Sequence, residues 1–182
     1  MNTRLPLTGL RVIDFGTAWA APMATQLLAD YGAEVIKVET NTRLDGLRLG
    51  RPMIGDDLSG GDRGLWPELQ PVFHGINRNK LSITVDMKTS EGIKIIQDLI
   101  AQSDVIINNY SPGVLDRLGL NYDSLVKLKP DIILVSMPAV GDVGPMKDVL
   151  AYAPIIQALS GLMSLVGYDE EEQLVGELQA PW

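Results

Sequence analysis

The chain has 182 residues, about the size of one domain, and 46% of them are hydrophobic. The net charge of −8, from 15 Lys and Arg against 23 Asp and Glu, argues against general electrostatic binding to nucleic acid or to an anionic membrane. The sequence contains no Cys and a single His, His74, which excludes disulfides, thiolate catalysis and metal sites built from several Cys or His side chains.

The acidic excess lies in the second half of the sequence. Residues 1–100 hold 11 basic and 12 acidic side chains, whereas residues 101–182 hold 4 and 11. An anionic ligand is therefore expected to use basic side chains of the first half. The start of the chain lacks an apolar leader, and its longest apolar stretch, 153–166, is too short and polar to span a bilayer. We expect a soluble, cytoplasmic protein.

The first forty residues predict a strand–helix–strand unit. The apolar runs Arg11–Phe15 and Glu34–Glu39 are typical of strands. Between them, Pro22 suits the first turn of a helix and Gly32 suits its C-cap. Four apolar residues fall at helical spacing in this helix: Met23, Leu27, Leu28 and Tyr31. A unit of this kind predicts parallel strands joined by a right-handed crossover.

The rest of the chain continues the alternation of strands and helices. Residues 40–72 show no period and predict a long loop. Three further strands are expected at 81–85, 104–107 and 131–136, and helices at 90–100, 114–118, 122–128 and 154–165. In the 90–100 helix, which Thr89 or Ser90 can cap, the expected inner face is Ile93, Ile96, Leu99 and Ile100.

The predicted fold class is α/β: a Rossmann-like, doubly wound, mostly parallel sheet with flanking helices. We expect residues 1–168 to form one ligand-binding domain that includes the long loop. Residues 169–182 do not complete a domain, and we expect them to start a connection to a missing second half.

Ligands in such sheets bind beyond the carboxyl ends of the strands, which directs attention to two loops. The first, Gly16–Pro22, is not a G-x-G-x-x-G turn, and no Walker A motif occurs, which disfavours a conventional NAD or ATP site. It does place Trp19 and a helix N-terminus where backbone N–H groups favour anions. The second, Asn108–Gly113, follows a buried strand, and Arg117 comes one helical turn later. Simple packing of Trp19 and simple turn formation by Asn, Pro and Gly remain open alternatives.

Basic residues flank the predicted strand at 81–85. Lys80 precedes it and Lys88 follows it, so the two could approach a phosphate from different sides. A solvated surface position is the simpler expectation for either lysine. His74, beside Phe73, is expected to be structural, since nothing in the sequence marks a partner for it. The residues by themselves indicate an α/β binding domain for an anionic ligand and name no reaction.

Five segments together resemble the class III CoA-transferases of the CaiB/BaiF type, the relatives of formyl-CoA transferase and α-methylacyl-CoA racemase. They are Leu7–Phe15, Ala20–Glu39, Asn77–Gly92, Asp104–Gly119 and Ser160–Gly167. They agree with the N-terminal portion of the family in order and spacing, and they span almost the whole chain.

The resemblance implies transfer of CoA from an acyl-CoA to a carboxylic acid. In the family an Asp attacks the thioester, and an aspartyl-CoA intermediate passes CoA to the acceptor. Two alternatives stay open: an acyl-CoA racemase of the same family, which uses acid and base groups at the α-carbon, and a non-catalytic CoA-binding module. Coenzyme A, as acyl-CoA, is the expected ligand, with no metal. The implied assembly is an interlocked homodimer of a full-length chain, or a complex with a partner chain if the protein is split.

The resemblance also implies which residues bind CoA. The matching positions are Thr17, Ala18, Trp19, Ala20, Val85, Met87, Lys88, Asn109, Tyr110 and Arg117. Lys88 and Arg117 are expected to face phosphates, and Val85, Met87 and Tyr110 are expected to face the adenine.

The sequence departs from the family at three places. Thr40 replaces a basic residue of some members, for which Arg43 could substitute, and Leu150 replaces a Lys. The nucleophilic Asp is expected after Trp182, because Asp169 comes too early. We therefore expect no catalytic residue in this chain, and no transferase activity from the 182 residues alone.

Overall fold

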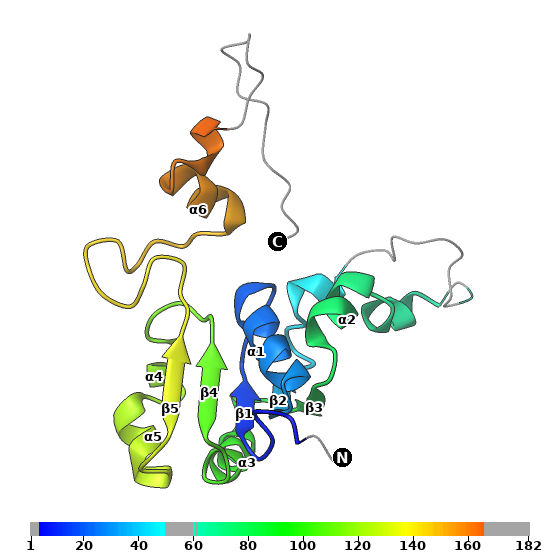
Figure 1. Ribbon diagram of the computed structural model, residues 1–182, viewed down its shortest axis with the longest axis vertical. Helices are drawn as coiled ribbons and strands as arrows, with labels where there is room; N and C mark the ends of the chain where they lie inside the picture. The colour runs from blue at the N-terminus through cyan, green and yellow to red at the C-terminus, as the bar shows by residue number, and fades with distance from the viewer. Residues whose placement is uncertain (1–3, 50–59, 61, 166–182) are drawn as a thin grey trace. The chain divides into compact units, whose positions relative to one another are not determined.

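The computed structural model of the protein describes residues 4–49, 60 and 62–165. The chain divides into two compact units, Met1–Met137 and Pro138–Trp182. The first unit holds the sheet, and the second holds a short helical segment (Figure 1).

The sheet of the first unit has five strands that are all parallel, in the order β3-β2-β1-β4-β5. The strands are β1 Arg11–Asp14, β2 Glu34–Glu39, β3 Leu81–Thr84, β4 Val105–Asn108 and β5 Ile133–Ser136. Each lies within about one residue of its predicted position, except that β5 begins two residues late. The predicted α/β fold with a parallel sheet and flanking helices is confirmed.

Helices connect successive strands. Those of the first unit are α1 Ala20–Asp30, α2 Pro71–Asn77, α3 Ser90–Ile100, α4 Val114–Arg117 and α5 Tyr122–Leu128. Three short 3₁₀ helices are η1 Gly46–Arg48, η2 Arg63–Glu68 and, in the second unit, η3 Leu162–Leu165. The predicted capping of α3 is confirmed, because the Thr89 side chain accepts a hydrogen bond from the Gly92 backbone N–H.

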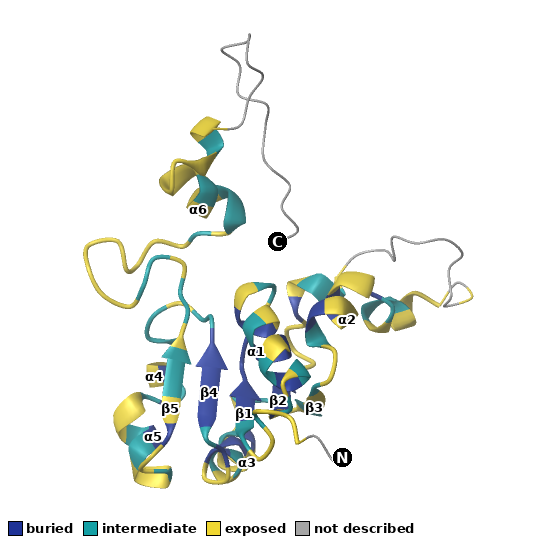
Figure 2. Cartoon of the chain, in the orientation of Figure 1, coloured by how far each residue is buried: buried dark blue, intermediate teal, exposed yellow. Residues whose placement is uncertain are grey.

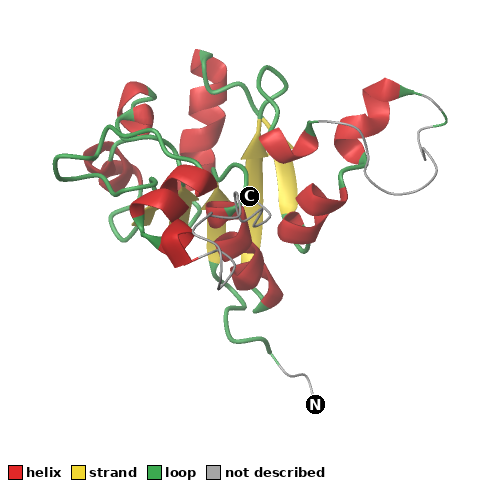
Figure 3. Ribbon diagram, turned by 90° about the horizontal axis from the view of Figure 1, so that it is seen from above, coloured by secondary structure: helices red, strands yellow, loops and turns green. Residues whose placement is uncertain are grey.

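Two separate apolar cores lie on the two faces of the sheet, where helices cover it from both sides (Figure 3). Because side chains alternate along a strand, Val12 of β1 faces α1 whereas Ile13 faces α3. The α1 core contains mainly small side chains such as Ala21 and Ala29. The core on the other side contains larger ones from α3, α4 and α5. Figure 2 shows β4 and all but the first residue of β1 in the dark blue of buried residues.

The α1 helix and its C-cap expose three of their four large apolar residues, and the fourth, Leu28, packs against the α1 core. The exposed fractions of Met23, Leu27 and Tyr31 are 45%, 48% and 58%, although they fall at helical spacing. Thr25 and Ala29 are buried instead. Small residues allow α1 to lie close to the sheet, and the hydroxyl of Thr25 is buried with hydrogen-bond partners.

The predicted loop at 40–72 contains regular structure where it is described. Asp45 accepts a hydrogen bond from Leu47 N and caps η1. Pro71 opens α2, a helix that the sequence analysis did not predict, and Phe73 and Ile76 are its buried residues. Residues 50–59 and 61 lie outside the described part.

The second unit contains α6, Ala153–Leu159, followed by η3. The single helix expected at 154–165 is interrupted at Gly161, whose φ of +78° lies in the left-handed region. The domain boundary expected at residue 168 and the connection 169–182 fall outside the described residues and stay predictions. Within the described residues, none of the helices is both long and apolar enough to cross a bilayer.

Candidate functional site

The strand order places a topological switch point between β1 and β4. From β1 the chain adds β2 and β3 on one side, and later β4 and β5 on the other. Ligands of doubly wound sheets bind outside the carboxyl ends of the strands at such a point. The loops that leave β1 and β4 are the two that the sequence analysis singled out.

One side chain joins these two loops. Asn109 Oδ1 accepts a hydrogen bond from Thr17 N at 2.8 Å, and Asn109 Nδ2 donates to Thr17 O at 2.7 Å. Both ends of the amide are therefore used on one residue of the β1 loop. The predicted site residues Thr17 and Asn109 do lie together. The Asn109 side-chain amide holds the β1 loop through its two hydrogen bonds to Thr17.

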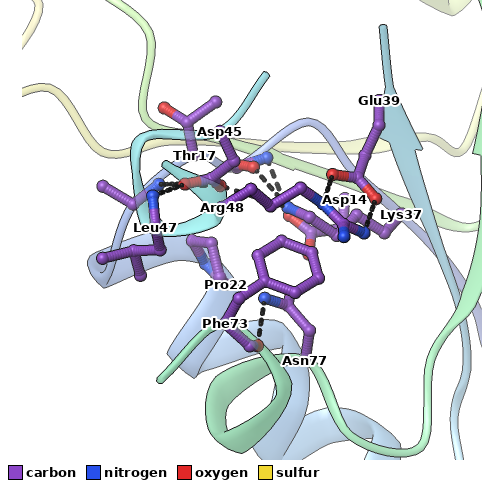
Figure 4. Close-up of polar contacts among 12 residues, drawn as sticks. Asp14, Thr17, Pro22, Lys37, Glu39, Asp45, Leu47, Arg48, Phe73 and Asn77 are labelled. Atoms are coloured by element: carbon purple, nitrogen blue, oxygen red, sulfur yellow. Dashed lines mark hydrogen bonds and ion pairs between the residues drawn. The ribbon is translucent and has the colours of Figure 1, made fainter. Parts of the chain in front are cut away.

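Buried charges hold the neighbouring residues of the β1 loop. Lys37 Nζ donates to Gly16 O at 2.8 Å and lies 3.8 Å from Asp45 Oδ2. Asp45 in turn accepts from Ala18 N, at 3.2 Å to Oδ1 and 3.0 Å to Oδ2 (Figure 4). The side chains of Lys37 and Asp45 are each 3% exposed. The Ala18 backbone has a φ of +56°, in the left-handed region.

A second buried pair lies at the end of β1. Asp14 Oδ2 accepts from Lys80 Nζ at 2.8 Å and from Thr25 Oγ1 at 2.7 Å, while Asp14 Oδ1 accepts from Gly16 N at 2.7 Å. The solvated position expected for Lys80 is wrong, since its side chain is 1% exposed. Burial lowers the pKa of Lys80, and the nearby Asp14 carboxylate opposes that shift. A Cβ at Gly16 would come within 2.7 Å of Asp14 Oδ1 and of Pro22 Cδ, so only glycine fits there.

The end of β2 carries a third pair on the same face. Arg48 donates from Nε and Nη2 to the two oxygens of Glu39, each at 2.8 Å, and its guanidinium lies 3.6 Å from the Phe73 ring centroid (Figure 4). Burial alone raises the pKa of Glu39, but the hydrogen bonds and charge of Arg48 outweigh it and hold the pKa below its ordinary value. Arg48 thereby ties η1 to the sheet and to α2.

The opposite face of the sheet is apolar at the same edge. Phe15 is fully buried and its ring stacks with Tyr110, with centroids 6.4 Å apart. Met87 and Tyr110 pack against the core that contains Val85, which is 7% exposed. Burial raises the pKa of Tyr110 to about 12, with a smaller contribution from the Asp14 charge. The charge of Arg43 has the opposite and smallest effect on this pKa.

Lys88 and Arg117 both lie on the surface of the first unit. Among the described residues, neither side chain has a hydrogen-bond or ion-pair partner. Two cations without partners are suited to an anionic ligand. The remaining members of the predicted set differ in exposure: Thr17 and Ala20 are exposed, whereas Ala18 and Trp19 are half-buried.

The structure thus unites part of the predicted set and leaves part of it apart. The β1 loop and Asn109 are in direct contact, and Val85, Met87 and Tyr110 share one core. Within the described residues, no hydrogen bond or ion pair joins the side chain of Lys88 or Arg117 to either group. His74 does have a partner, because its Nε2 lies 2.7 Å from Glu68 O, which supports the structural role expected for it. No group of His, Asp and Glu side chains within the described ranges could hold a metal ion.

The sequence analysis missed the buried charges that shape the β1 loop. They are Asp14, Lys37, Asp45 and Lys80. One signal was available: Asp14 and Lys37 interrupt apolar runs, and a charge inside a central strand needs a partner. The arrangement as a whole is a rigid loop between a polar face and an apolar face, next to the N-terminus of α1. The first turn of α1 carries no acidic residue and no side-chain cap, a combination suited to binding a group that is part anionic and part apolar.

Known proteins match the chain over nearly its whole length. The succinyl-CoA:glutarate CoA-transferase of Mus musculus is 39% identical over 165 residues, which are 91% of this chain and 35% of the mouse protein. The formyl-CoA:oxalate CoA-transferase of Streptomyces avermitilis is 38% identical, over 90% of this chain and 37% of that protein. The chain therefore spans well under half the length of these curated relatives.

Solved structures agree with the sequence matches. A CAIB/BAIF family protein from Brucella suis superimposes with a TM-score of 0.81 at 38% identity, covering 96% of this chain and 44% of that one. A hypothetical protein from Mycobacterium tuberculosis gives a TM-score of 0.78 at 30% identity, over 95% and 45%. The sequence pattern described as CoA-transferase family III matches residues 7–179. With the resemblance, the sheet and these matches in agreement, the chain belongs to CoA-transferase family III.

Proposed function

We propose that this chain carries the CoA-binding part of an enzyme that moves CoA from an acyl-CoA to a carboxylic acid. The observation that carries the proposal is the junction of the β1 and β4 loops at the switch point, where Asn109 holds both peptide groups of Thr17. CoA lies against Thr17–Ala20 and Asn109, with its adenine toward Met87 and Tyr110.

The charges available fit the phosphates of CoA. Lys88 and Arg117 are exposed, and neither has a salt-bridge partner in the described part of the chain. Arg43, which the resemblance offers in place of the basic residue missing at Thr40, is a third cation of the proposed site. The buried lysines cannot play this part, since Lys37 and Lys80 are enclosed and already bonded. Charge-assisted hydrogen bonds from exposed cations to phosphate are the strong contacts expected at such a site.

In the proposed reaction an Asp beyond Trp182 attacks the thioester carbonyl and releases CoA, forming a mixed anhydride. CoA thiolate then attacks the aspartyl carbonyl and releases the first acid. The acceptor carboxylate attacks the carbonyl of the aspartyl-CoA thioester and releases CoA thiolate, which leaves a second mixed anhydride. The thiolate then attacks the acyl carbonyl of the acceptor, which forms the new acyl-CoA and frees the Asp carboxylate. The chain's own residues bind and orient CoA through these exchanges. An interlocked homodimer, or a partner chain that supplies the nucleophile, completes the site in this proposal.

The names of the relatives support transfer over racemisation and suggest a class of acid. Glutarate and oxalate, in the names of the relatives above, are both dicarboxylates. A relative from Chloroflexus aurantiacus is named as the beta subunit of a succinyl-CoA–L-malate CoA-transferase. We therefore propose that the acid that accepts CoA in the reaction of the present protein is a short-chain dicarboxylic acid.

Calorimetry with the purified chain tests the proposal. We expect CoA to bind, and dephospho-CoA, which lacks the 3′-phosphate, to bind more weakly by about tenfold. An acyl-exchange assay with succinyl-CoA and labelled glutarate should show no turnover by the 182 residues. Turnover would overturn the expected position of the nucleophile, and an absence of any CoA binding would overturn the proposed function itself.

A further inference from the structure

The β1 loop is held at every backbone polar group from Gly16 N to Ala18 N. Asp14 accepts from Gly16 N, and Lys37 donates to Gly16 O. Asn109 pairs with both Thr17 N and Thr17 O, and Asp45 accepts from Ala18 N. These four side chains come from different places: β1, β2, the loop after β4 and the N-cap of η1. A loop bonded in this way has its conformation set before any ligand arrives.

From this arrangement we infer that Asp45 is a positioning residue for the acyl-CoA site, acting through Ala18. The inference rests on the proposed function, since that proposal places CoA on this loop. Asp45 bonds Ala18 N with both carboxylate oxygens, and it also caps η1 through Leu47 N at 2.9 Å. One buried carboxylate therefore fixes the β1 loop against the segment that follows β2.

The conformation of Ala18 explains why a clamp is needed. Its φ of +56° is disfavoured for any residue with a Cβ, so the loop would relax toward another conformation without a compensating bond. The Ala18 N–H is itself used by the buried Asp45 carboxylate. The next residues, Trp19 and Ala20, begin α1, and the place of their N–H groups follows from that of Ala18.

Asp45 itself does not contact the ligand in this scheme. It is 7% exposed, its oxygens are engaged by two backbone N–H groups, and Lys37 lies 3.8 Å away to balance its charge. Its effect on affinity is therefore indirect and must depend on Ala18. A residue that contacted the ligand directly would affect the Kd whichever residue stood at position 18, so this dependence distinguishes a positioning residue from a contact residue.

The test is a double-mutant cycle on the purified chain with CoA as the probe. Asp45→Asn keeps the shape of the side chain but removes its charge and one acceptor oxygen. We expect it to raise the Kd for CoA about tenfold when Ala18 is present. In an Ala18→Gly background the same substitution should raise the Kd less than threefold, because glycine adopts a positive φ without a penalty.

Amide hydrogen exchange provides a readout that a general loss of stability would not produce. In Asp45→Asn the Ala18 amide should exchange at least tenfold faster, while the Ile13 amide in β1 keeps its protection. The matched control is Asp30→Asn, the same substitution at a carboxylate near the far end of α1 that bonds Gln26, Arg78 and Asn79. It should leave both the Kd and the Ala18 exchange rate unchanged.

A variant without an unpaired buried charge covers the case in which Asp45→Asn does not fold. Lys37→Met combined with Asp45→Ala removes both charges and both loop contacts together, so no buried ion is left alone. It should show the same fast exchange at Ala18 and the same loss of affinity. Unchanged affinity with a protected Ala18 amide, in either variant, would overturn the positioning role while the proposed function stands. Failure of the wild-type chain to bind CoA would overturn the proposed function, and this inference with it.

Discussion

The two faces of the sheet reach its carboxyl edge with opposite chemistry. On the α1 face, three ion pairs are buried or nearly so: Lys80 with Asp14, Lys37 with Asp45, and Arg48 with Glu39. On the α3 face the same edge is made of Phe15, Val85, Met87 and Tyr110. On the polar face, each of these charged side chains is paired with another one. Lys88 and Arg117, on the surface beyond the apolar face, have no ion-pair partner among the described residues.

This difference separates shape from recognition. Buried charges with a full set of partners hold a backbone in place but cannot leave those partners to bind a ligand. Exposed cations and an apolar wall cost little to present and gain their partners when a ligand binds. We therefore expect substitutions of the buried charges to act through stability and the conformation of the β1 loop, and substitutions of the exposed cations to act directly on affinity.

The largest effect should come from Asp14→Ala, which strikes the polar face at its centre. It leaves Lys80 with a buried charge and removes acceptors from Thr25 and Gly16 N. The free energy of unfolding should fall by about 3–5 kcal/mol, measured by urea denaturation. As a control, Lys94→Ala breaks the exposed ion pair with Asp98 and should cost no more than about 0.5 kcal/mol. Equal costs for the two variants would contradict the distinction between the faces.

A pH titration should separate Tyr110 from the charges of the polar face. Its pKa is raised to about 12 from an ordinary value of 10.0, so the folded chain keeps the phenol proton in a range where the unfolded chain loses it. The stability from this group is complete below pH 10.0 and is lost as the pH rises toward 12.

The matching variant is Tyr110→Phe, which has no proton to lose. Relative to this variant, the wild-type free energy of unfolding should fall by up to about 2 kcal/mol over that pH range. Thermal unfolding followed by circular dichroism measures the difference. Parallel pH curves for the two proteins would show that the Tyr110 hydroxyl is not buried in solution.

Removal of the free cations should weaken ligand binding without affecting the fold. Lys88→Ala and Arg117→Ala should each raise the Kd for CoA about tenfold, about 1.4 kcal/mol, because each removes a charge-assisted contact to phosphate. The melting temperature should stay the same, since the described residues give neither side chain a partner to lose. Lys127→Ala, at an exposed lysine of α5, is the control and should bind CoA normally. Unchanged affinity in both site variants would remove these residues from the site.

The smallest effect is expected at the edge of the polar face, at Glu39. Arg48 lowers its pKa below the ordinary 4.5, so its stabilising effect is present above that pH and is lost as the pH falls below it. The stability difference between wild type and Glu39→Gln should therefore shrink on acidification, by less than about 1 kcal/mol after screening by solvent. A difference that is constant from pH 7 to pH 3 would argue against the Arg48–Glu39 bond.

The strands and most helices could be predicted because their signals are local. The residues that make up each signal are close in sequence, as in the apolar run Glu34–Glu39 or in Thr89 and the helix that it caps. The structure has the predicted element at both places. The exposed face of α1 could not be predicted from spacing, because Met23 and Leu27 follow the helical period whichever side packs. Which side of α1 faces the sheet depends on how closely the helix packs, and the small side chains of Ala21 and Ala29 allow that close packing.

The candidate site divides in the same way. The two loops could be predicted because each follows a strand of the expected Rossmann-like sheet, whereas the strand order and the contact through Asn109 came from the structure. The buried network was not predictable, because Asp14 and Lys80 are 66 positions apart and lysines before a strand are usually solvated. The one indication in the sequence was that Asp14 and Lys37 stand inside apolar strand patterns, where a buried charge needs a partner.

The pairing of Asn109 with Thr17 has a mechanical consequence. By donating and accepting as a peptide group does, the Asn109 side chain acts as one more rung between β1 and β4, past the last backbone pair at Asp14 and Ile107. The two loops are thereby kept at a fixed spacing where their backbones are otherwise free to diverge. A displacement of either loop passes directly to the other, so the ends of these two strands behave as a single part.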